Sequence, residues 1–164
     1  MASEVRPRKG RFGGKDHLNV ASTLGRPLTR TRILIADDHD IFRRSLRALV
    51  ESASRWEVCG EATNGVEALE EARKLAPDVI VMDIGMPYLN GLDATKQIRK
   101  ELPHIRVVIL SQYDSSPMLT AAIEAGASAY VTKAQSAHHL LAALEKVAGG
   151  RSFPSTDQEP LKSD

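Results

Sequence analysis

The sequence predicts a doubly wound α/β domain in which helices cover both faces of a five-stranded parallel sheet. Five short apolar runs alternate with five longer segments whose apolar residues recur every three or four positions. The third run, at residues 79–82, is apolar throughout, as expected for a strand buried on both faces. This alternation implies crossovers between parallel strands, so we expect one domain over about residues 31–151.

Proline, glycine and capping residues set the expected boundaries of these elements. Asn64 is a predicted N-cap, Pro103 ends a helix, and Ser116 followed by Pro117 begins another that stops at Gly126. The predicted strands are residues 33–36, 56–61, 79–82, 107–110 and 129–132. The predicted helices are residues 41–53, 65–76, 92–102, 117–125 and 140–148. The apolar face of the first helix is expected to contain Ile41, Phe42, Leu46, Leu49, Val50 and Ala53.

The composition is that of a globular protein, with 42% hydrophobic and 26% charged residues in a chain of 164. No apolar run is long enough to cross a membrane, and the single cysteine, Cys59, excludes an internal disulfide. These features predict a cytoplasmic protein.

The two ends of the chain differ in composition from the middle. Residues 1–30 contain seven Lys or Arg and two acidic residues, with few large apolar side chains, so we expect a disordered basic extension. Residues 152–164 are polar and are expected to form a tail without a DNA-binding domain. Specific DNA binding by this chain is therefore not expected.

Polar residues stand at the ends of the predicted strands. The first strand is followed by Asp37 and Asp38, the third by Asp83, the fourth by Ser111 and the fifth by Lys133. The carboxyl ends of parallel strands meet at one edge, where open α/β sheets bind ligands. Three carboxylates repel one another unless a cation joins them, and Mg²⁺ prefers oxygen ligands. A lysine and a hydroxyl beside them suit phosphoryl oxygens, so this edge is predicted to receive a phosphoryl group.

Four motifs in this order resemble the receiver domain of two-component response regulators. They are residues 33–39 (ILIADDH), 81–87 (VMDIGMP), 109–111 (ILS) and 129–133 (AYVTK). The resemblance is closest to the subfamily that usually carries a C-terminal LuxR-type helix-turn-helix. It implies a flavodoxin-like sheet with the strand order 2-1-3-4-5.

The resemblance implies that Asp83 accepts a phosphoryl group from a histidine kinase or phosphotransfer protein. Asp38 and Asp83 would bind Mg²⁺ directly, Asp37 through a water molecule, and Gly85 through its backbone carbonyl; Mn²⁺ would substitute. Such a protein is a signalling phosphoacceptor with at most slow self-dephosphorylation, rather than an enzyme.

The resemblance also assigns the residues that complete the transfer and transmit the signal. Lys133 would bind the phosphoryl group, Ser111 would be the switch hydroxyl and Tyr130 the switch aromatic residue. The face that they control is expected to make a phosphorylation-dependent partner contact, of which a homodimer is one form. Ala134 follows the lysine where many relatives have a proline close by.

Other interpretations stay open at this point. Lys133 alone could be a surface lysine, Ser111 a strand-end hydroxyl, and Asp40 a cap of the first helix. His39 is interpreted as a solvated or capping residue rather than a metal ligand. The alternative function is a flavodoxin-like small-ligand or nucleotide-binding module, although an acidic pair after the first strand would repel a phosphate.

Overall fold

One parallel sheet of five strands, in the order β2-β1-β3-β4-β5, forms the centre of the molecule. The structure is a computed structural model and describes residues 29–135 and 137–150. The strands are β1 (Thr31–Ala36), β2 (Trp56–Ala62), β3 (Val79–Asp83), β4 (Arg106–Ser111) and β5 (Ala129–Thr132). The helices are α1 (Asp40–Glu51), α2 (Gly65–Leu75), α3 (Gly91–Glu101), α4 (Ser116–Glu124) and α5 (Ala137–Ala148). The predicted fold class, strand order and alternation of elements are confirmed.

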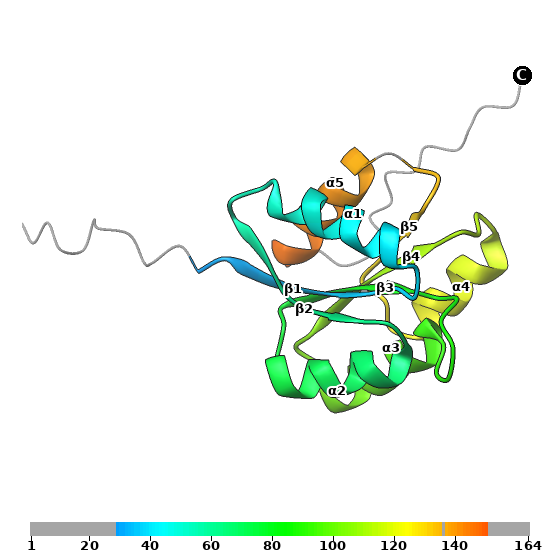
Figure 1. The fold of residues 1–164 in the computed structure, drawn as a ribbon. Helices are drawn as coiled ribbons and strands as arrows, with labels where there is room; N and C mark the ends of the chain where they lie inside the picture. Colours follow the sequence, from blue (N-terminus) through cyan, green and yellow to red (C-terminus); the bar gives the residue numbers. More distant parts are fainter. Residues whose placement is uncertain (1–28, 136, 151–164) are drawn as a thin grey trace, which may run out of the picture.

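The sheet separates two hydrophobic cores, because successive side chains of a strand point to opposite faces. On one face, Leu34 and Ile80 pack with side chains of α2, α3 and α4. On the other face, Ile35 and Val81 pack with side chains of α1 and α5. Figure 1 shows α1 and α5 on one side of the sheet and α2 and α3 on the other. All five residues of β3 are buried, as predicted for its apolar run.

The strand order places a reversal of direction between β1 and β3. From β1 the chain reaches β2 at one edge, then returns past β1 to β3 and continues to β5. The crevice outside the carboxyl ends of β1 and β3 is the topological switch point of such a sheet. The acidic strand ends predicted from the sequence therefore meet at this point.

The prediction for the apolar face of α1 was wrong at Ile41, whose side chain is 82% exposed. Each helical residue advances by about 100°, so Phe42, Leu46 and Leu49 define a stripe that excludes Ile41. Arg43 lies on the opposite flank of this stripe and is 9% exposed. A charged residue therefore occupies a buried position of this helix.

Helix termini agree with the sequence in two cases and differ in one. Asn64 caps α2 as predicted, because its side chain accepts a hydrogen bond from the backbone N–H of Glu67 at 2.9 Å. Gly126 follows α4 with a φ of 90°, a conformation that favours glycine. The N-cap of α4 is Ser115 rather than the predicted Ser116, and its side chain makes no capping hydrogen bond within the described residues.

The termini of the chain were also the subject of predictions. The basic extension lies almost wholly, and the polar tail wholly, outside the residues that the structure describes. Those two predictions and the exact domain limits stay predictions.

Candidate functional site

Asp83 is the last residue of β3 and is 2% exposed. Its Oδ1 atom lies 3.3 Å from the Nζ of Lys133. Its Oδ2 atom is buried and has no hydrogen-bond partner among the described residues. A buried carboxylate oxygen without a partner is rare and costly, which marks this atom as a point of chemical interest.

Lys133 follows β5 and joins the carboxylates of two other strands. Its Nζ lies 2.8 Å from Asp37 Oδ2 and 3.3 Å from Asp83 Oδ1. The ammonium group also lies 4.5 Å from the centre of the Phe42 ring. Because its side chain is only 12% exposed, Lys133 is not a surface lysine. The prediction that it lies with the acidic strand ends is met in the structure.

Asp37 and Asp38 follow β1 and differ in exposure. Asp37 is 1% exposed, and its Oδ1 accepts a hydrogen bond from the backbone N–H of His39 at 2.8 Å. The side chain of Asp38 is 30% exposed, and its Oδ1 lies 3.0 Å from Nδ1 of His39. His39 is half exposed and is the N-cap residue of α1, as interpreted from the sequence, although its side chain makes no capping hydrogen bond within the described part of the chain.

These groups are close enough to share a metal ion. One ligand atom each from Asp37, Asp38, His39 and Asp83 lies within 4.8 Å of the others. Oxygen ligands on opposite sides of Mg²⁺ are about 4 Å apart, so small adjustments would suffice. Burial and the negative charge of Asp37 raise the pKa of Asp83, although Lys133 opposes this shift. Three carboxylates beside one lysine leave an excess of negative charge, which fits a divalent cation.

Gly85 lies two residues beyond Asp83 in the loop after β3 and is exposed, between the buried Ile84 and Met86. A Cβ atom placed on Gly85 would meet no described atom within 4 Å. Space does not require glycine here, in agreement with a role that involves only the backbone. Its predicted carbonyl contact to a metal stays a prediction.

Ser111 and Tyr130 both bond to the backbone of Tyr113. Ser111 ends β4, and its Oγ accepts a hydrogen bond from the N–H of Tyr113 at 3.0 Å. The hydroxyl of Tyr130 on β5 donates to the carbonyl oxygen of Tyr113 at 2.5 Å. The two residues predicted as switches are therefore linked through the backbone of Tyr113.

Sequence reasoning missed Tyr113 and Arg43. Tyr113 contributes backbone atoms, so its residue type carries no signal. Arg43 could have been noticed as a charge three residues after Asp40, beside the apolar stripe of α1.

Comparison with known proteins agrees with this geometry. The family model described as the response regulator receiver domain matches residues 33–145. The chain belongs to this family. The predicted resemblance is thus confirmed, and the family implies a phosphoacceptor role and disfavours the small-ligand alternative.

Several relatives of this receiver domain are known. The chain is 40% identical over 124 residues to the transcriptional regulatory protein LnrK of Bacillus subtilis (strain 168), covering 75% of this chain and 56% of LnrK. It is also 40% identical over 117 residues to the chemotaxis protein CheY of Thermotoga maritima, covering 71% of this chain and 97% of CheY. The chain spans 56 to 63% of the length of the first curated relatives that it matches.

Solved structures agree with the predicted resemblance to the LuxR-type subfamily. A LuxR-family two-component response regulator from Aurantimonas sp. SI85-9A1 superimposes with a TM-score of 0.74 at 37% identity, covering 78% of this chain and 91% of that one. A LuxR-family DNA-binding response regulator from Staphylococcus aureus is a further neighbour, with a TM-score of 0.69 and 28% identity over 72% of this chain and 98% of that one.

Among the described residues, no helix has the length and apolar character needed to span a bilayer.

Proposed function

We propose that this receiver domain accepts a phosphoryl group on Asp83 from a histidine kinase or phosphotransfer protein in the cytoplasm. The observation that carries the proposal is the Asp83 carboxylate itself. It is buried at a strand end, has one oxygen without a partner, and lies against Lys133. A nucleophile in this position needs only a donor in line with its oxygen, because phosphoryl transfer depends mainly on positioning and charge neutralisation.

The bond changes involve one oxygen and one phosphorus atom. An Asp83 oxygen forms a bond to phosphorus while the bond from phosphorus to the donor's imidazole nitrogen breaks, and the histidine leaves. Lys133, released in part from Asp37, pairs with a phosphoryl oxygen. Hydrolysis of the acyl phosphate by water would return Asp83 to its starting state slowly.

Asp37, Asp38, Asp83 and the Gly85 carbonyl would hold Mg²⁺, or Mn²⁺ in its place. The bound ion would neutralise charge that develops on the phosphoryl oxygens. The excess of negative charge among the three carboxylates supports this assignment.

Ser111 and Tyr130 would transmit the change. New acceptor oxygens on Asp83 would draw the Ser111 hydroxyl away from Tyr113, and Tyr130 would follow into the space beside β5. The surface of α4, β5 and α5 would then carry the phosphorylation-dependent partner contact, for example a homodimer. We expect no sequence-specific DNA contact from these residues.

Intact-mass analysis after incubation with acetyl phosphate and Mg²⁺ tests the proposal. The wild-type chain should gain one acid-labile phosphoryl adduct, and Asp83→Ala should gain none. Asp114→Asn, a change at an exposed aspartate in the loop after β4, is the matched control and should behave as wild type. An adduct that persists in Asp83→Ala would contradict the assignment. So would the absence of an adduct in the wild-type chain with every phosphodonor tried.

A further inference from the structure

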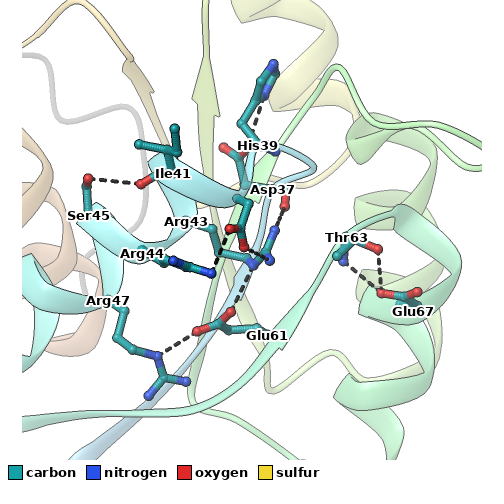
Figure 2. Close-up of polar contacts among 11 residues, drawn as sticks. Asp37, His39, Ile41, Arg43, Arg44, Ser45, Arg47, Glu61, Thr63 and Glu67 are labelled. Carbon is teal, nitrogen blue, oxygen red and sulfur yellow. Dashed lines mark hydrogen bonds and ion pairs between the residues drawn. The ribbon is translucent and has the colours of Figure 1, made fainter.

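Arg43 is a buried cation that bonds to three acceptors, which lie after β1, on β2 and on its own helix α1 (Figure 2). Its Nη1 donates to the main-chain oxygen of Asp37 at 2.8 Å. Its Nε donates to Oε2 of Glu61, on β2, at 2.8 Å, and its Nη2 donates to Oδ1 of Asp40 at 2.9 Å. A planar guanidinium with donors in a fixed fork can satisfy all three acceptors at once, which an ammonium cannot. Asp40 is therefore the first residue of α1 and an ion-pair partner, rather than its predicted cap.

The acceptor on Asp37 belongs to the peptide unit that joins Asp37 to Asp38. The N–H of Asp37 still bonds to Ala62 of β2 at 3.0 Å, but β1 ends at Ala36. Beyond the end of the strand, Arg43 supplies the donor for the Asp37 carbonyl. Fixing this peptide unit limits the directions in which both carboxylates can point.

Glu61, the partner of Arg43 on β2, also bonds to a second arginine. Oε1 of Glu61 accepts a hydrogen bond from Nε of Arg47 at 2.6 Å, and Nη1 of Arg47 bonds to Glu51 at 2.9 Å. Glu61 therefore lies between two guanidinium groups and forms an ion pair with each, as Figure 2 shows. Charge-assisted bonds of this kind are stronger than neutral ones, so Glu61 is a firm acceptor for the buried Arg43.

We propose that Arg43 is a positioning residue for the phosphoacceptor site. It holds the Asp37–Asp38 peptide so that both carboxylates face the position of a divalent cation before the cation arrives. It touches neither the metal nor the phosphoryl group, and the inference rests on the proposed function. Loss of a residue that orients metal ligands typically weakens metal affinity 10- to 100-fold.

The test uses Arg43→Met in the full chain, with Arg44→Met and Arg47→Met as matched controls. Arg44 also pairs with Asp40, at 2.9 Å, and Arg47 also bonds to Glu61, but neither contact reaches Asp37. Calorimetric titration should give a Mg²⁺ dissociation constant about tenfold higher in Arg43→Met. Both controls should stay within about twofold of wild type, as expected for partly exposed ion pairs.

Two further measurements separate positioning from a general loss of structure. In Arg43→Met, the Mg²⁺ concentration for half-maximal phosphorylation by acetyl phosphate should rise, while the extent at saturating Mg²⁺ recovers. Backbone amides of residues 37–39 should exchange hydrogen faster in Arg43→Met than in either control. If circular dichroism shows that Arg43→Met does not fold, Arg43→Lys replaces it, with the same changes expected because one ammonium cannot span three acceptors.

Three outcomes are distinguishable. A raised dissociation constant in the folded Arg43 variant, with both controls unchanged, supports the positioning role. Mg²⁺ affinities equal to that of wild type in all three variants, with unchanged hydrogen exchange at residues 37–39, would overturn the positioning role while leaving the proposed function intact. Failure of the wild-type chain to bind Mg²⁺ or to become phosphorylated would instead reject the proposed function.

Discussion

Asp83 carries a charge that its surroundings in the folded chain disfavour. Its carboxylate is buried beside that of Asp37, and both effects raise its pKa. Lys133 lies 2.8 Å from Asp37 but 3.3 Å from Asp83, so the lysine is shared unequally. At neutral pH an ionised Asp83 is therefore less favourable in the folded than in the unfolded chain. The ionised Asp83 carboxylate therefore lowers the stability of the folded chain, and pKa shifts of this kind are common among the reactive residues of functional sites.

Replacing Asp83 with asparagine should therefore stabilise the chain in the absence of Mg²⁺. Removing the charge relieves the burial and repulsion, while Lys133 keeps its partner Asp37. A gain of about 1 kcal/mol would raise the melting temperature by roughly 4 °C for a domain of this size. Calorimetry in the presence of a chelator would measure the shift, with Asp114→Asn as an exposed control. A lower melting temperature for Asp83→Asn would show that the ion pair with Lys133 outweighs the repulsion.

At the scale of elements, the loop after β4 joins the site to the face formed by α4 and β5. The backbone of Tyr113 bonds to Ser111 on one side and to Tyr130 on the other. Movement of the Ser111 hydroxyl toward a phosphoryl oxygen would break its bond to the Tyr113 N–H. The Tyr130 bond would then lose its fixed acceptor, which would couple β4 to β5 through the backbone of Tyr113.

We predict that Ser111→Ala leaves Asp83 able to bind beryllium fluoride, a phosphoryl mimic, but reduces the response of residues 111–147. The phosphoryl group shifts a population only through contacts that differ between two states, and Ser111 supplies one of them. Hydrogen exchange with and without the mimic measures the response. Ser115→Ala is the control, because this serine makes no capping hydrogen bond within the described residues. Changes in exchange confined to the loop after Asp83 in wild type would refute the coupling.

At the scale of the whole molecule, the ion pairs of Glu61 connect β2 with α1. Burial raises the pKa of Glu61, but hydrogen bonds from Arg47 and Arg43 outweigh it and lower the pKa below its usual 4.5. A carboxylate with a lowered folded pKa stabilises the fold fully above its unfolded value, and this contribution disappears as the pH falls through the folded pKa.

The free energy of unfolding should accordingly depend less on pH below 4.5 in Glu61→Gln than in wild type. At pH 7 the variant should be less stable by about 1.5 kcal/mol, the scale of a hydrogen bond to a charged group. Urea denaturation at several pH values would measure both effects. Glu145→Gln, which removes an exposed ion pair with Arg55, should change little. Parallel pH profiles for Glu61→Gln and wild type would contradict the prediction.

The sequence by itself determined the alternation of strands and helices, because apolar periodicity is a local property of the chain. It also determined which residues stand at strand ends. Asp37, Asp38, Asp83 and Lys133 meet in the structure because parallel strands present their carboxyl ends at one edge. Their separate roles in phosphoryl transfer stay predictions. The capping role of Asn64 was equally readable, since it depends on residues three positions apart.

Only the tertiary structure decided which side chains these elements present to one another. The buried Arg43 on α1 bonds to Glu61, 18 residues away on β2, and no local pattern contains that contact. The exposure of Ile41 follows from the same orientation of α1 against the sheet. The partner of Ser111 is a backbone group, so no residue type signals it. Local periodicity specifies elements, whereas the contacts that orient a site arise between elements and exist only once they have packed.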